Sequence, residues 1–461
     1  MYTRMKRRAA AFTLALLAAS SQAHGPNGLE AQIEALRAQM REMQQALQAL
    51  QALQQAPQPT AAARQEGRAP QTDGAHLGPA VHKPAWPAAP TGHLGVNTAA
   101  VPFTAPGDIE EPRVSFFGYG EMLYTRPRTD GAQAMATARR AVLGMAYRFN
   151  ERTRLAAELE VENAVVSAGD QGELAFEQLY IEHDWSERVS AKLGLFLLPI
   201  GYMNQTHEPT RYLGVNRNLV ETAIIPTTWR ELGVGLQGRT EQGWRWNTGL
   251  VTSFDLTRWP SDAGQTRESP LGAIHQEGQL ARAASAATYG ALNYDGVPGL
   301  NVGGSLYSGG IAQKQMGQLA PQARVQLSEL HTRWQPGRWD LSALAAFGRL
   351  SGVADFNASA VSAGNPVPDQ FRGAYAQAAY RIWQNGDLSL LPFARYERVN
   401  AALGFSGLPQ GLLPAPMPDA RVMTLGASFY LHPQVVLKLD AQRHLENSQL
   451  DRFNLGLGFH Y

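Results

Sequence analysis

The stretch that decides the fold is Arg452-Phe-Asn-Leu-Gly-Leu-Gly-Phe-His-Tyr461, at the C-terminal end of the sequence. Side chains along a β-strand point alternately to opposite faces, so every second residue shares a face. One face of this segment carries only large apolar side chains: Phe453, Leu455, Leu457, Phe459 and Tyr461. The other face carries only glycine and polar side chains. The segment therefore predicts a strand that lies between an apolar and a polar environment.

This segment resembles the C-terminal strand of bacterial outer-membrane β-barrels, where alternating apolar residues before a final aromatic form the assembly signal. The resemblance implies that the five apolar residues are read by the barrel-assembly machinery and then face outer-membrane lipid. It predicts the outer membrane of a Gram-negative bacterium as the location.

The same alternation recurs through residues 113–461. In segment 154–162, for example, Leu155 and Leu159 point one way, whereas Glu158 and Glu160 point the other way. We predict about 16 strands from such segments. Their ranges are 114–124, 139–150, 154–166, 173–185, 189–198, 232–239, 244–254, 286–295, 300–308, 323–334, 338–349, 371–384, 387–399, 421–432, 434–445 and 451–461.

The connections between these segments alternate between short and long. Tight turns occur at 150–153, 240–243, 295–299, 335–337, 384–386 and 432–434, whereas 199–231, 255–285, 350–370 and 400–420 are long. Short turns on one rim and long loops on the other are typical of transmembrane antiparallel β-barrels, with the short rim in the periplasm. A soluble β-rich protein is the alternative, but it would need polar outward faces. The predicted fold is all-β.

The N-terminal residues predict export. Four basic residues precede an apolar run from about residue 9 to 19, and Ser21-Gln-Ala23 offers small residues for cleavage, so we predict a signal peptide over 1–23. The chain has no cysteine, which rules out a disulfide framework and thiolate metal sites. Lys and Arg total 40 against 39 Asp and Glu, and this balance argues against nucleic-acid binding.

Two further segments lie before the predicted barrel. Residues 28–55 predict a periplasmic coiled coil, and the Pro-, Ala- and Gly-rich residues 56–112 predict a linker. The coiled-coil seam consists of Leu29, Ile33, Leu36, Met40, Met43, Leu47 and Leu50. Such a narrow apolar seam is buried only against a partner helix, which predicts an oligomer, either a dimer or a trimer.

Three motifs add a family resemblance. Phe117-Gly-Tyr-Gly-Glu-Met122, Gly194-Leu-Phe-Leu-Leu-Pro-Ile-Gly201, and the segment from His207-Glu-Pro209 to Ile225-Pro-Thr-Thr-Trp229 look like the phosphate-selective type of outer-membrane porin. The resemblance implies a channel of sixteen strands that assembles as a homotrimer. The family's best-known members carry ladders of arginine and lysine along the lumen. This chain departs from that pattern, because its predicted inward faces carry both signs of charge.

Loop 199–231 is the third long loop, which in general porins folds into the lumen. We predict that it forms the constriction of a water-filled channel. An ordinary surface loop is the alternative. The residues expected at the constriction are His207, Glu208, Arg211, Arg217, Glu221 and Arg230, with carboxylates facing guanidiniums. The residues expected to face the lumen are Arg148, Glu158, Glu160, Glu162, Lys192 and Arg245.

Catalysis and metal binding have no motif in the sequence, which lacks G-x-S-x-G, H-E-x-x-H and a phosphate-binding glycine loop, so no enzyme activity and no cofactor are expected. Two functions stay open. The first is a porin for passive diffusion of ions or small hydrophilic solutes, with anions such as phosphate among them. The second is a structural anchor with a plugged lumen, whose coiled coil binds the cell wall or an envelope partner. An uptake channel for large hydrophobic solutes is less favoured, because no N-terminal plug is found.

Overall fold

A computed structural model describes residues 113–165, 172–260, 269–317, 319–359, 361–362, 364–408 and 419–461. The predicted signal peptide at 1–23, the coiled coil at 28–55 with its seven seam residues, and the linker at 56–112 lie outside the described residues.

The described chain is built almost entirely from strands. In the first half these are β1 (Val114–Pro127), β2 (Met135–Arg148), β3 (Thr153–Glu162), β4 (Glu173–Asp184), β5 (Val189–Leu197), β6 (Arg230–Arg239), β7 (Trp244–Thr252) and β8 (Ala286–Tyr294). The second half adds β9 (Leu300–Gly310), β10 (Arg324–Trp334), β11 (Trp339–Ser351), β12 (Gln370–Tyr380), β13 (Trp383–Asn385), β14 (Leu388–Gly404), β15 (Ala420–His432), β16 (Val435–His444) and β17 (Arg452–His460). Short helical turns are η1 (Gly131–Gln133), η2 (Val220–Ile224), η3 (Leu256–Arg258), α3 (Ala354–Asn357) and η4 (Ser448–Leu450).

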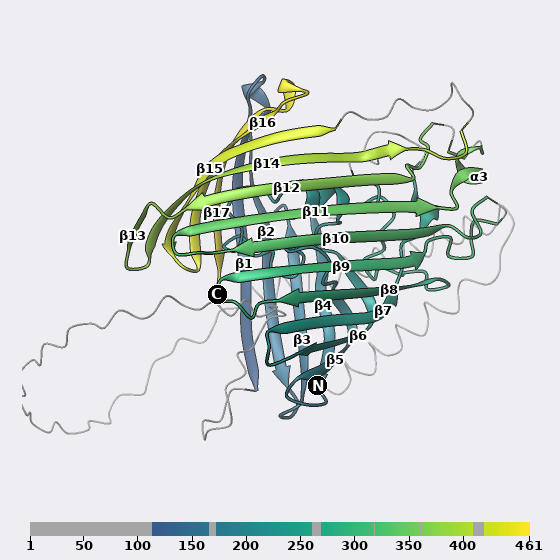
Figure 1. Ribbon diagram of the computed structural model, residues 1–461, viewed down its shortest axis with the longest axis horizontal. Helices are drawn as coiled ribbons and strands as arrows, with labels where there is room; N and C mark the ends of the chain where they lie inside the picture. The colour runs from purple at the N-terminus through teal and green to yellow at the C-terminus, as the bar shows by residue number, and fades with distance from the viewer. Residues whose placement is uncertain are drawn as a thin grey trace, which may run out of the picture. The chain divides into compact units, whose positions relative to one another are not determined.

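These strands close into an antiparallel barrel. Each strand pairs with the next along the chain, and β17 pairs back onto β1, for instance Tyr124 opposite Leu455. The short β13 continues β12 along the same neighbour, β14, so the seventeen segments make sixteen strands. The successive strands can be followed in Figure 1. All sixteen predicted segments are confirmed, although β2 begins at Met135 rather than 139 and β14 extends to Gly404 rather than 399.

The outward face of the barrel is apolar and exposed. Leu143, Leu306 and Leu330 expose 60, 66 and 73% of their surface, although they belong to three different strands. In the C-terminal strand β17, Phe453 and Leu455 are exposed while Asn454 between them is buried. The predicted alternation is therefore confirmed on the outward side.

The inward face divides into two regions, and only one of them matches the prediction of a polar interior. Inward residues of β1–β4 and β14–β17 are mostly charged or polar, and we call this surface the charged wall. Its buried charged residues include Glu121, Arg140, Glu158, Glu160, Glu177, Arg395, Glu397, Lys438 and Asp440. Towards the rim of long loops, the inward residues of β7–β12 are apolar instead, a surface that we call the apolar wall.

The apolar wall is a packed core inside the barrel. It includes Val251, Tyr307, Leu327, Leu350 and Phe371, each at most 3% exposed. The connections between β7 and β8 and between β9 and β10 cover it with Leu256, Leu271, Ile274 and Ile311, all fully buried. The expectation of polar inward faces was wrong for this region, because these loops fold in and bury the strand ends that would otherwise meet water.

Tryptophans lie near the rim of short turns. Trp185, Trp244, Trp339 and Trp383 expose between 42 and 58% of their surface there. Trp229 is instead fully buried against Phe254 and Tyr307, with ring centroids 5.1 and 4.6 Å away. Nearness to a strand end therefore does not decide whether a tryptophan side chain points outward or into the core.

Among the described residues, no helix is both long and apolar enough to cross a membrane.

Candidate functional site

The candidate site is the lumen and the segment 198–229 that lies inside it. This segment joins β5 to β6 at the rim of long loops, and most of its residues are buried. Gly201 starts the inward turn with a φ of +80°, a conformation that glycine adopts without steric cost. A Cβ at this position would lie 2.8 Å from a carboxylate oxygen of Glu221, so both conformation and space require glycine.

The second part of the segment packs on the apolar wall. Val220 and Ile224 of η2 lie against β12 at Gly373, where a Cβ would come within about 3.0 Å of Ile224. Ile225 and Trp229 are fully buried in the same core. Burial of these side chains holds the end of the segment against one side of the barrel.

The middle of the segment binds the charged wall through its own backbone. Lys438 Nζ donates to the Gly214 carbonyl at 3.0 Å, and the Val215 N–H donates to Asp440 Oδ2 at 2.7 Å. The Leu219 N–H donates to Glu397 Oε1 at 2.5 Å. Charged side chains thus satisfy backbone groups that a buried irregular segment would leave unpaired.

His207 is held at a β-bulge. Glu158 pairs with Gln178 and Leu159 with Phe176, so Glu177 is the extra residue on β4 and turns inward. His207 Nε2 lies 2.6 Å from Glu177 Oε1 and 2.8 Å from the Tyr119 hydroxyl, which donates to Glu177 Oε2 at 2.9 Å. Burial alone would lower the pKa of His207, but the adjacent Glu177 carboxylate outweighs it, and the pKa of His207 is raised.

The charged wall carries an ion network centred on Arg140 of β2. Its guanidinium lies 2.8 Å from Glu121, 3.2 Å from Glu160 and 3.5 Å from Glu162. On the opposite side of the β1–β17 pair, Arg395 and Glu397 of β14 are 2.9 Å apart and both buried. Both signs of charge therefore line this wall.

Among the described residues, no ion pair or side-chain hydrogen bond joins any two of the six residues expected at the constriction. His207 pairs with Glu177 and Arg230 with Glu277, at 3.2 Å. Arg217 donates to the hydroxyls of Thr227 and Thr228, whereas Glu221 accepts from the Met203 N–H and from Asn218. Glu208 and Arg211 are half-buried. Arg230 belongs to β6 rather than to the segment, because β6 begins at residue 230 and the expected strand began at 232.

The six residues expected to face the lumen lie on inward positions. Glu158 accepts from Gln178 at 2.8 Å, and Glu160 and Glu162 belong to the Arg140 network. Lys192 Nζ lies 4.9 Å from the Tyr180 ring. Arg148 and Arg245 lie near the rim of short turns, where Arg245 pairs with Asp295 at 2.7 Å.

The list of lumen-facing residues expected from the sequence omits several charged residues of this wall. Arg395 and Glu397, like Lys438 and Asp440, are spaced two apart on strands that alternate, so the same pattern that indicated Glu158 would have found them. Glu177 carries no such signal, because its inward direction depends on the bulge. Among the described residues, no cluster of three or more His, Asp or Glu has the geometry to hold a metal ion.

The chain matches no known protein-family model. An uncharacterized protein of Aquifex aeolicus (strain VF5) is 29% identical to it over 342 residues, which cover 72% of this chain and 75% of that protein. Among solved structures, Salmonella typhi OmpF in complex with daunomycin has 12% identity and a TM-score of 0.51, over 76% of this chain and 97% of that one. The anion-selective porin from Comamonas acidovorans has 14% identity and a TM-score of 0.47, over 76% and 98%. The similarity to OmpF shows a shared barrel fold.

Proposed function

We propose that this chain is an outer-membrane porin through which ions or small hydrophilic solutes diffuse passively. The observation that carries the proposal is the contrast between the two sides of the barrel. A wide band of exposed leucine, valine and phenylalanine covers the outside, while buried charges of both signs line the inside.

The outward band favours lipid over water as its environment. An apolar surface of this extent would be costly in water, and hydrocarbon removes that cost. The exposed tryptophans at the rim of short turns suit the interface between lipid and water. The long loops would then face the exterior and the short turns the periplasm.

Segment 198–229 would narrow the lumen. It leaves the wall between β5 and β6, bonds to β14, β15 and β16, and returns along β12. The passage for water would follow the charged wall, where polar side chains can replace part of a solute's hydration shell. His207, Arg217 and Glu221 would shape the passage by holding the segment rather than by facing each other across it.

The mixed charges support weak ion selectivity. Arg140, Arg395 and Lys438 lie on the same wall as Glu121, Glu160, Glu397 and Asp440, so a permeating ion of either sign meets opposite charges. Anions such as phosphate would pass without a dedicated ladder of cations. A homotrimer, clamped by the segment 28–55, remains part of this proposal.

The test is single-channel current from the purified full-length protein in a planar bilayer, with a salt gradient and added phosphate. Stepwise conductance with a reversal potential near zero is expected. A reversal potential close to that of a perfectly selective channel would contradict the mixed-charge account, although not the channel.

The structural anchor is the second candidate, and one observation favours it. The hydrogen bonds from segment 198–229 reach several strands on different sides of the lumen, as expected of a plug. Folded, correctly inserted protein that carries no current would support the anchor and overturn the porin.

A further inference from the structure

A row of arginines follows the outside of the barrel at the rim of long loops. Six strands that are consecutive around the wall each direct one arginine outward there, and all six are exposed. They are Arg324 of β10, Arg349 of β11, Arg372 of β12, Arg398 of β14, Arg421 of β15 and Arg443 of β16. We call them the arginine belt.

The belt is continuous across the strand pairing. Arg349 lies opposite Gln370, two residues before Arg372, and Arg398 lies directly opposite Arg421. Neighbouring strands are about 4.8 Å apart, so cations at matching heights lie within reach of one polyanionic group.

The acidic residues beside the belt balance only part of its charge. Arg398 pairs with Asp419 and Arg421 with Glu446, whereas among the described residues the other four belt arginines form no ion pair. Within the described part of the chain, two of the six guanidiniums are therefore paired with a carboxylate. An outward surface meant only for hydrocarbon would not carry such an excess of cations.

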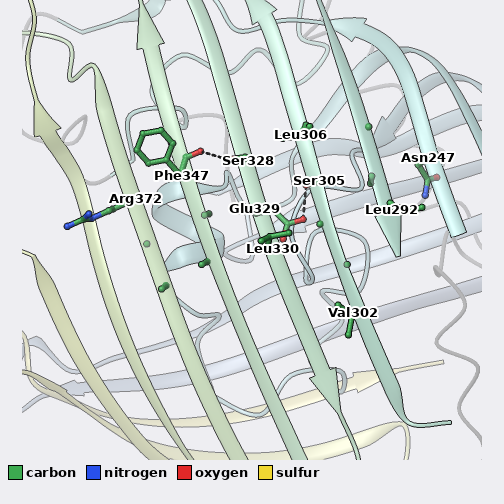
Figure 2. Close-up of a pocket in the computed structure, with 18 of the residues that line it drawn as sticks. Asn247, Leu292, Val302, Ser305, Leu306, Ser328, Glu329, Leu330, Phe347 and Arg372 are labelled. Carbon is green, nitrogen blue, oxygen red and sulfur yellow. Dashed lines mark hydrogen bonds between the residues drawn. The ribbon is translucent and has the colours of Figure 1, made fainter. Parts of the chain in front are cut away.

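An apolar hollow begins directly beside the belt. It has a volume of about 1380 Å³ and extends along the outward face from Trp244 and Leu292 to Arg372, Arg398 and Asp419. Its sides are the exposed Leu306, Leu330 and Phe347, which Figure 2 labels together with Arg372.

Small outward residues make the hollow deep. Gly304, Ser328 and Ala345 stand between the larger side chains on three adjacent strands. Phe347 lies directly opposite Arg372 in the strand pairing, so the apolar hollow and the cations meet at one point.

We propose that the hollow and the belt together bind a phosphorylated, multiply acylated glycolipid of the outer leaflet, of the lipid A type. Its phosphates bind Arg349, Arg372 and Arg398, since guanidinium groups match phosphate in a bidentate way. Its acyl chains pack into the part of the hollow nearest the belt, beside Phe347. A soluble anion would bind the belt but has no apolar groups to occupy the hollow. A second copy of this chain that docked by the same surface would bring two cationic belts together, and these would repel each other. The inference needs the membrane location from the proposed function but not an open channel.

The experiment measures lipid binding to the full-length protein in detergent by native mass spectrometry. The probe is bisphosphorylated hexaacyl lipid A, compared with its dephosphorylated form and with phosphatidylglycerol. The triple variant R349Q/R372Q/R398Q tests the belt. Its matched control, R152Q/R188Q/R338Q, removes three exposed arginines from the rim of short turns, and each triple breaks one ion pair.

The belt variant is expected to bind lipid A roughly 10- to 100-fold more weakly, while the control binds as the parent does. The dephosphorylated lipid is expected to bind the parent as weakly as lipid A binds the belt variant. Unchanged binding by the belt variant, equal loss in the control, or equal affinity for phosphatidylglycerol would each overturn the proposal.

A second variant tests the hollow without touching any charge. A345W places a bulky side chain among the small residues and is expected to weaken lipid A binding while leaving heat-modifiable migration unchanged. If A345W instead leaves lipid binding intact and abolishes a chemically cross-linked dimer of this chain, the hollow is an interface between copies and the proposal is overturned.

Discussion

The two walls inside this barrel hold segment 198–229 by different physics. On the apolar wall, Trp229 and Ile224 are fully buried among Phe254, Tyr307 and Phe371. On the charged wall, Glu397, Lys438 and Asp440 bond to the segment's backbone. One wall packs apolar side chains on the segment, whereas the other bonds to its backbone through buried charged groups.

Under the proposed function, this difference would let the segment narrow the lumen without closing it. The apolar wall provides most of the stability, because burial of large side chains contributes more than single polar contacts do. The charged wall is the side along which solutes would move. Three predictions test this division, and the first has the largest expected effect.

Trp229→Ala should destabilise the barrel by about 3–5 kcal/mol, since it opens a cavity in the apolar wall. Denaturant unfolding of the refolded protein, followed by its heat-modifiable migration, measures the effect. Trp383→Ala is the control, because Trp383 is exposed at the rim of short turns. Equal losses of unfolding free energy in the two variants would show that the apolar wall is not a stabilising core.

Glu397→Gln should cost about 1.5–3 kcal/mol, because it leaves the buried Arg395 guanidinium without its charged partner. The same unfolding assay applies. The control Arg188→Gln breaks an ion pair with Glu241 in which both side chains are exposed, and it should cost about 0–1 kcal/mol. A loss from E397Q as large as that from W229A would mean that the charged wall carries the stability as well.

The smallest effect concerns His207 and pH. Its pKa is raised in the folded protein, so protonation stabilises the fold. That contribution is complete below the unfolded pKa of about 6.5 and is lost as pH rises through the higher folded value. The stability of the parent relative to His207→Gln should therefore fall as pH rises across this window. A difference in stability that stays constant with pH would show that Glu177 does not stabilise the protonated form of His207.

The strands were predictable because their alternation depends only on local sequence, as in segment 452–461. The inward fold of segment 198–229 was predicted from its length and position. Its contacts were not, because they join residues far apart in the chain, such as Gly214 and Lys438. The apolar wall was not predicted, because it is defined by loops that are distant in sequence and pack on it only in the folded barrel. The inward turn of Glu177 was not predicted either, because it depends on a bulge that alternation cannot reveal.

The most direct test of the account uses the absence of cysteine in the chain. Arg154→Cys and Glu162→Cys place a thiol on the charged wall, where the parent side chains are 32 and 34% exposed. Leu327→Cys places one on the apolar wall, where the parent residue is 2% exposed. A charged, water-soluble thiol reagent added during planar-bilayer recording should reduce the current in the first two variants and leave the third unchanged. Reduction at Leu327, or none at Arg154 and Glu162, would contradict a water-filled path along the charged wall.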